Sequence, residues 1–168
     1  MDSRWILKRR DLWEWSWRAA ICILLSAWGL AKVTDADYWA PGVAFSLLII
    51  PARRGFKLPL LVAVALAYSV AYAGMASLGD NANPWVLRIA VVSLGSFLLG
   101  QSLRSWGGLS KKQALEQWLL GTVLAVPFWQ AILGGADGAP SFQKWILAFA
   151  VWQGPMSYLY FAQTKKGA

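Results

Sequence analysis

Long apolar stretches alternate with short polar connections along nearly the whole chain. One bilayer crossing requires about 20 consecutive apolar residues in a helix, and the stretches predict six such segments. The second is short for a crossing, with about 14 residues. The pattern therefore predicts an all-α polytopic membrane bundle of six transmembrane helices. The predicted spans are 17–33, 38–51, 58–78, 84–103, 114–134 and 142–163.

Basic residues gather in alternate connections between these spans. The other connections hold Asp35, Asp37, Asp80 and Asp137 and few basic residues. Cytoplasmic loops of membrane proteins carry an excess of Lys and Arg, so both termini are predicted to be cytoplasmic. The basic clusters are Arg4, Lys8, Arg9, Arg10 and Arg18, then Arg53, Arg54 and Lys57, then Arg104, Lys111 and Lys112, and finally Lys165 and Lys166, which leaves only Lys32, Arg88 and Lys144 on the other side.

The basic residues also affect the predictions for the second span and for the N-terminal segment. Arg53 and Arg54 follow the short second span, and they favour a full crossing over a re-entrant segment. Residues 1–16 mix tryptophan and leucine with basic residues, which predicts a cytoplasmic basic interfacial helix; a disordered basic tail is the alternative. The six-span domain then covers 17–163, and 164–168 form a cytoplasmic tail.

Composition agrees with a membrane protein. The 168 residues are 58% hydrophobic and 14% charged, whereas a soluble domain has about 25% charged residues. The net charge of +8 could indicate nucleic acid, but the basic residues are spread over connections. We therefore expect contact with anionic lipids and no nucleic acid. The expected localisation is the bacterial cell inner membrane, as a multi-pass protein.

Few residues suit catalysis. The chain has no histidine and one cysteine, Cys22, which excludes a Ser-His-Asp triad and the common zinc sites. No span carries paired carboxylates, and no glycine-rich loop precedes a Lys-Ser or Lys-Thr pair. The sequence predicts a non-enzymatic protein without a metal or cofactor.

Two ionisable residues lie near or inside spans. Arg88 lies one turn into the fourth span, and Glu116 lies at the start of the fifth. Charged residues within a membrane often mark functional sites, although both could extend to the nearby interface. Arg88 is a candidate anion contact. Polar and aromatic residues deeper in the spans could line a cavity with it or form interhelical hydrogen bonds, and the full candidate substrate-binding set is Arg88, Trp129, Gln130, Trp152 and Gln153.

A stripe of small residues follows one face of the third span. Ala63, Ala67 and Ala71 are spaced four residues apart, and small side chains let membrane helices approach closely. The stripe predicts packing within the bundle or a docking face for a membrane partner.

The stretch 18–55 contains Arg18–Ala19–Ala20, Tyr38–Trp39–Ala40, Pro51 and Gly55. With these residues it resembles the opening of the fusaric-acid-resistance (aromatic-acid exporter) membrane domain. The length and spans also resemble the rod-shape determinant MreD. Trp39–Ala40–Pro41–Gly42, Ala44 and Leu103–Arg104 are similar to the MASE-one sensory membrane domain.

Two functions follow as expectations. The first, implied by the exporter resemblance, is a small permease or permease half that moves a small amphipathic anion. The second is a non-catalytic scaffold subunit of a cell-envelope complex. Either function suits a homo-oligomer or a subunit of a membrane complex.

Overall fold

A computed structural model describes residues 7–32, 40–49, 58–77, 85–133 and 141–165 of the chain. Within these ranges all regular structure is helical and no strand forms, so the predicted all-α class is confirmed. The helices are α1 (Arg9–Lys32), α2 (Ala40–Ile49), α3 (Leu58–Ser77), α4 (Trp85–Ser105), α5 (Lys111–Val123), α6 (Ala125–Leu133) and α7 (Phe142–Lys165).

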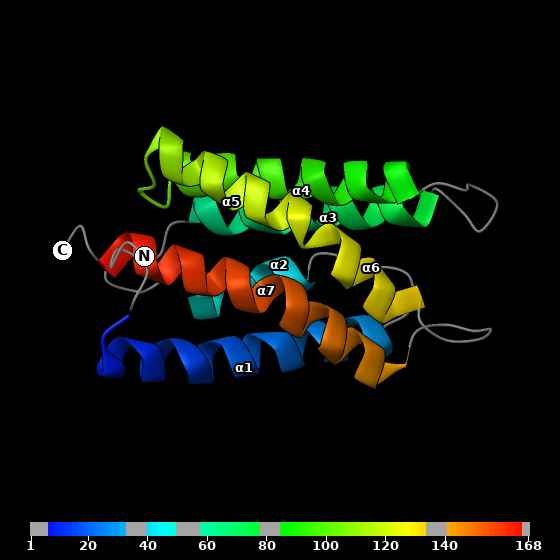
Figure 1. Cartoon of the computed structure of the whole chain (residues 1–168), viewed down its shortest axis with the longest axis horizontal. Helices are drawn as coiled ribbons and strands as arrows, with labels where there is room; N and C mark the ends of the chain where they lie inside the picture. The colour runs from blue at the N-terminus through cyan, green and yellow to red at the C-terminus, as the bar shows by residue number, and fades with distance from the viewer. Residues whose placement is uncertain (1–6, 33–39, 50–57, 78–84, 134–140, 166–168) are drawn as a thin grey trace.

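The helices form an antiparallel bundle (Figure 1). Each helix packs against the next one along the chain, and α1 packs against α7 to close the ring. Helices α5 and α6 follow one another as a single bent rod, so the ring contains six rods. The starts of α1, α3 and α5 lie at the same end as the ends of α2, α4 and α7, on the left in Figure 1.

We name this left end the basic end, because the described basic residues Arg9, Arg10, Arg104, Lys111 and Lys112 lie there. The opposite end holds Arg88 and Lys144, near the starts of α4 and α7. Lysines and arginines of the predicted clusters therefore gather at one end of the bundle wherever they are described. The residues Arg4, Arg53, Arg54, Lys57 and Lys166 lie outside the described part.

Helix α1 differs from the predicted N-terminus. An interfacial helix over 1–16 was expected to precede a separate span, but α1 runs without a break from Arg9 to Lys32. Neither glycine nor proline occurs between Arg9 and Trp28 to end the helix, so the basic, tryptophan-rich turns continue directly into the apolar ones. Residues 1–6 lie outside the described part.

Helix α2 is only 10 residues long. At 1.5 Å per residue it extends about 15 Å, roughly half of a hydrocarbon core. Arg18 of α1 reaches its C-terminal turn, where the guanidinium donates to the carbonyl of Leu48 at 3.2 Å and also pairs with Glu14 at 3.0 Å. A cation at this position complements the negative end of the helix dipole.

Helix α5 begins earlier than predicted and ends sooner. Its start at Lys111 follows a capping box, in which the Ser110 side chain accepts from the Gln113 backbone N–H and the Gln113 side chain accepts from that of Ser110. This arrangement satisfies two of the free N–H groups at a helix start. The predicted span at 114–134 therefore extends three residues further toward the N-terminus.

Pro127 explains why the rod divides into α5 and α6. Proline has no N–H, so the carbonyl of Val123 lacks its usual partner four residues on. Helix α5 ends at Val123, and α6 begins at Ala125 after the single residue Leu124. Backbone bonds from Leu124 to Leu120 and from Phe128 to Leu124 bridge the break.

Glycines bring neighbouring helices close together. A Cβ at Gly42 of α2 would lie 2.6 Å from the Cα of Ala65 on α3, and one at Gly95 of α4 would lie 2.5 Å from the Cβ of Ala71. Such small-residue contacts are typical of packed membrane helices. Similar close approaches join α4 to α5, at Gly100 with Ala114 and at Gly121 with Ser96.

The bundle buries an apolar core that includes a few polar side chains, and it also exposes many large apolar side chains. Among the charged residues whose side-chain exposure is described, the exposed ones lie at the basic end: Lys8, Arg9, Arg10, Arg104, Lys111 and Lys112. The sides of the rods expose large apolar residues instead, which we name the apolar belt: Ile21, Leu24, Leu25, Trp28, Val62, Leu66, Val70, Leu94, Phe97, Leu119, Val123 and Leu147. The buried polar residues are Ser26, Ser46, Ser96, Ser102, Gln117, Gln153, Ser157 and Thr164.

One described helix, α4 (Trp85–Ser105), is both long enough and apolar enough to cross a membrane when length and composition are considered alone. By these two criteria one described helix qualifies as a membrane span, compared with the six spans predicted from the sequence.

Candidate functional site

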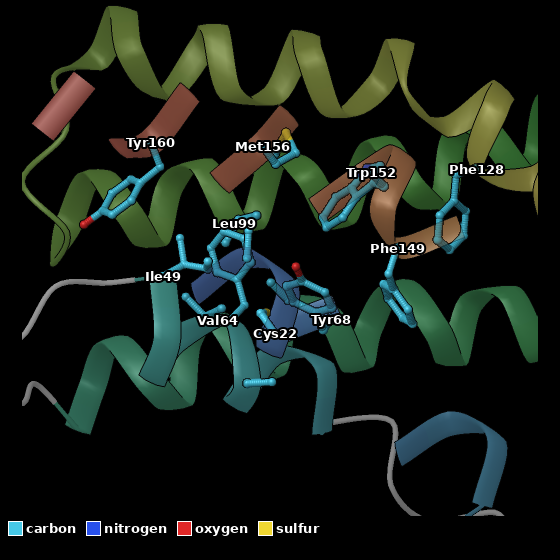
Figure 2. Close-up of a cluster of buried hydrophobic side chains, with 14 of the residues drawn as sticks. Cys22, Ile49, Val64, Tyr68, Leu99, Phe128, Phe149, Trp152, Met156 and Tyr160 are labelled. Atoms are coloured by element: carbon cyan, nitrogen blue, oxygen red, sulfur yellow. The ribbon is translucent and has the colours of Figure 1, made fainter. Parts of the chain in front are cut away.

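A small apolar cavity lies inside the bundle, toward the end opposite the basic end. Its free volume is about 40 Å³, which leaves room for one or two molecules the size of water. Aromatic rings form much of its wall, and Figure 2 shows several of them on facing helices. The lining residues are Leu30, Pro41, Ala67, Tyr68, Ala71, Val92, Gly95, Phe128, Trp145, Phe149 and Trp152.

Ring contacts connect the aromatic wall across three helices. Tyr68 of α3 meets the Trp152 ring edge-on at 5.4 Å between centroids. Phe128 of α6 contacts Phe149 of α7 at 6.0 Å, and Trp145 stacks on Phe149 at 5.9 Å. Offset and edge-to-face rings attract one another beyond the area that they bury, so α6 and the first half of α7 pack as one aromatic unit.

A group of polar side chains adjoins the cavity at Tyr68. Gln153 of α7 is 1% exposed, and its amide N–H groups donate to the Tyr68 hydroxyl at 3.3 Å and to Ser26 Oγ at 3.1 Å. Its carbonyl accepts from the thiol of Cys22 at 3.6 Å. We name these four residues the Gln153 cluster. It joins α7 to both α1 and α3, and it satisfies polar groups that would otherwise be costly to bury.

Arg88 and Trp129 form a pair just beyond the cavity. The guanidinium carbon of Arg88 lies 5.2 Å from the centroid of a Trp129 ring, and the indole N–H of Trp129 donates to the Arg88 carbonyl at 3.3 Å. Val92, which lines the cavity, is four residues from Arg88 on the same face of α4. Phe128, the neighbour of Trp129, lines the cavity from α6. The half-buried Arg88 therefore lies one helical turn from a residue that lines the aromatic cavity.

The structure brings together part of the candidate set. Arg88 contacts Trp129, while Trp152 lines the cavity and donates its indole N–H to the Gly121 carbonyl at 3.2 Å. Gln153 belongs to the adjoining polar cluster. Among these five residues, only Trp152 is part of the cavity wall.

Gln130 was expected to face inward, but it faces outward. Its side chain is exposed, because the inward face of α6 is formed by Ala125, Phe128, Trp129 and Ile132. Those positions follow helical spacing and leave residue 130 on the opposite face. Among the described residues of α6, Gln130 is thus a polar side chain on the exposed face.

A second polar group near the basic end was not predicted as a unit. Gln117 of α5 is fully buried, and its amide donates to the Met156 carbonyl at 3.4 Å and to the Gln163 side chain at 3.3 Å. Gln163 in turn donates to the Glu116 carboxylate at 2.9 Å. Glu116 is therefore held by α7 rather than extended freely into water. The recurrence of glutamine at 113 and 117 was the available sequence signal.

Comparisons with protein families, with curated proteins and with solved structures find no match. The resemblances stated for the exporter domain, MreD and the sensory domain therefore stay predictions. Four of the residues that carry the first resemblance, Tyr38, Trp39, Pro51 and Gly55, lie outside the described part.

The alanine stripe packs inside the bundle along much of its length. Ala67 is 2% exposed, and the close approach of Gly95 to Ala71 places α4 against the same face. Ala63 is half-buried. The intramolecular alternative thus accounts for Ala67 and Ala71 without a partner protein.

Acidic residues, cysteine and histidine do not cluster within the described ranges: no group of three or more could hold a metal ion there.

Proposed function

We propose that the chain is an integral inner-membrane protein whose six rods cross the bilayer with both termini in the cytoplasm. The apolar belt is the observation that carries this proposal. Monomeric soluble proteins rarely expose contiguous apolar patches larger than a few hundred Å², whereas α1, α3, α4, α5 and α7 all expose large apolar side chains of the belt. Lipid is the solvent that suits such a surface.

The charge distribution supports the same orientation. Exposed cations lie at the basic end, where the positive-inside rule predicts the cytoplasm. Lys and Arg at this level also attract anionic lipid head groups. Trp13, Trp17 and Trp106 are exposed near the same end, as expected for tryptophans at a membrane interface.

Reporter fusions test the topology. Fusions truncated after Gly79 and after Gly135 are expected to report the outer side, because each position follows an odd number of crossings in the six-span arrangement. A fusion after Trp106, at the basic end, is the matched control and should report the cytoplasm. Alkaline phosphatase and a fluorescent protein provide the two readouts. A cytoplasmic signal after Gly79 or Gly135 contradicts six crossings.

Within the membrane, we propose that the protein binds and moves a small amphipathic anion. The support is the position of Arg88 one helical turn from an aromatic cavity. Aromatic walls suit the apolar part of such a solute, and a guanidinium suits its negative group. Because about 40 Å³ is too small for a solute of this kind, binding in this proposal requires the cavity to widen.

Replacing Arg88 by alanine is expected to reduce efflux of a carboxylate dye from vesicles at least fivefold, because the negative group then loses its partner. The readout is dye release from proteoliposomes that contain equal amounts of folded protein. Arg104→Ala is the matched control, since Arg104 lies on the same helix at the basic end and is exposed. Equal efflux by the two variants, or no efflux by the unmodified protein, contradicts transport.

A further inference from the structure

We infer that α6 and the first half of α7 form a hinged gate over the aromatic cavity, and that the Arg88–Trp129 pair holds this gate shut. The inference rests on the proposed function and adds the moving part and its release. A gate of this kind needs two hinges at one level of the bundle. It must also carry part of the cavity wall, and a contact must hold it against the remaining helices.

Both rods of the proposed gate are weakened by a proline. In the first rod, Pro127 leaves the Val123 carbonyl without its helical partner, and the helix is interrupted at Leu124. In α7, Pro155 lies inside the helix and leaves the carbonyl of Val151 in the same position. Kinks and bends in long helices concentrate at such sites.

The two weak points lie at the same level in the bundle. The indole N–H of Trp152 donates to the carbonyl of Gly121 at 3.2 Å. A Cβ at Gly121 would also lie 3.2 Å from Cε of Met156. Residues on either side of Pro155 therefore contact α5 just before its end, so α6 and the first half of α7 can rotate together about one axis.

The proposed gate carries a large part of the cavity wall. Phe128 belongs to α6, and Trp145 and Phe149 belong to the first half of α7. Their mutual ring contacts keep these three residues together. The facing wall, which includes Ala67, Ala71, Val92 and Gly95, belongs to α3 and α4, whose close packing keeps it in place. Rotation of the gate would widen the space between these two walls.

Arg88 and Trp129 tie the gate to α4. The contact combines a cation over an aromatic face with an indole hydrogen bond to a carbonyl. Loss of one cation–π contact of this kind is enough to change an open fraction severalfold. An anion that binds the Arg88 guanidinium competes with the Trp129 ring for it. Arrival of the anion would therefore weaken the contact that closes its own cavity.

Cysteine accessibility measures the gate without transport. The sole cysteine is replaced as Cys22→Ser, which keeps a hydrogen-bond donor toward Gln153, and Val92→Cys then places a thiol on the facing wall of the cavity. The readout is the rate of modification by a small, membrane-impermeant methanethiosulfonate in proteoliposomes. Adding Trp129→Phe to this background is expected to raise the rate about three- to tenfold, because it removes the indole donor and weakens the cation–π contact.

Trp118→Phe is the matched control for this change. Trp118 lies on α5, before the hinge, and its indole N–H also donates to α4, at Ser93 Oγ, 3.0 Å away. Its replacement is expected to leave the modification rate within twofold of the parent. An unchanged rate in the Trp129 variant, or an equal rise in both variants, overturns the assignment of Arg88 and Trp129 as the contact that closes the gate.

The hinge is tested by restoring an N–H. Pro155→Ala is expected to lower the modification rate about threefold or more, because a continuous α7 resists bending. Pro59→Ala is the control, since Pro59 lies in the first turn of α3, where proline removes no helical hydrogen bond. If Pro155→Ala behaves like Pro59→Ala, the hinge in α7 is excluded.

Release by an anion is tested with hexanoate, using hexanamide as the neutral control. Hexanoate is expected to raise the rate at Val92→Cys severalfold, and this rise should vanish in an Arg88→Gln variant. Equal effects of the two compounds exclude release through the charge of Arg88. If accessibility responds as expected while the dye assay shows no efflux, the gate stands and the transport proposal fails.

Discussion

Replacing Gly42 by alanine is expected to lower the thermal midpoint of the purified protein by about 4–8 °C, from a loss of about 2 kcal/mol. The added methyl would lie 2.6 Å from the Cα of Ala65 and 3.0 Å from the carbonyl oxygen of Val64. Both are backbone atoms of α3, so a side-chain rotation cannot relieve the clash. Either α2 or α3 must shift, and the contacts of both helices weaken.

Gly154→Ala is the matched control. A Cβ at Gly154 meets no atom within 4 Å, and alanine favours a helix over glycine by about 0.5–1 kcal/mol. The midpoint of this variant is expected to stay constant or rise. Thermal unfolding in one detergent, followed by circular dichroism, measures both variants. If Gly42→Ala is as stable as Gly154→Ala, α2 does not approach α3 as closely as described.

Gln153→Leu should reduce the free energy of unfolding by about 1–3 kcal/mol, because polar groups are then buried without partners. Leucine is similar in size to glutamine but offers nothing to the Tyr68 hydroxyl or to Ser26 Oγ. Polar contacts between membrane helices vary widely in strength, with a measured average of about 0.6 kcal/mol, so the loss depends on several contacts acting together. Unfolding in mixed detergent micelles provides the measurement.

Gln130→Leu is the matched control for Gln153→Leu, because it makes the same chemical change at an exposed position. Gln130 is exposed on α6, and a leucine there would extend the apolar belt. The expected change is within about 0.5 kcal/mol of zero, or a gain in a lipid environment. Equal losses at the two positions would mean that Gln130, like Gln153, has an inward role, which contradicts its described position.

Helix positions followed from the sequence where hydropathy and local signals agree. The sequence predicted a span at 84–103, and a helix is observed there at Trp85–Ser105, since Pro84 suits a helix start and the apolar run is uninterrupted. The start of α5 was missed, although Ser110 and Gln113 have the spacing of a capping box. A hydropathy average over a window of residues does not detect local hydrogen bonds such as those of a capping box.

The candidate site was harder to predict because inward direction depends on helix rotation. Trp129 and Gln130 are neighbours in the chain, yet one is buried and the other is exposed. The break at Leu124 interrupts the helical periodicity after α5. The residues of α6 that face inward therefore cannot be predicted by continuing the pattern of α5. Arg88 and Trp129 are 41 residues apart in the chain. Residue spacing within one helix cannot predict a contact between two such distant residues.

The contact between the first and last helices also bears on how the chain is assembled. Ser26 of α1 is separated from Gln153 by 127 residues, and the indole of Trp15 donates to Ser157 across 142 residues. During synthesis α1 is therefore made long before its polar partners on α7 leave the ribosome. Ser26 and Cys22 lack these partners until then, so the bundle can be completed only when α7 arrives. Until α7 is made, the unfinished ring exposes surface that the complete bundle buries, and such intermediates are prone to aggregation.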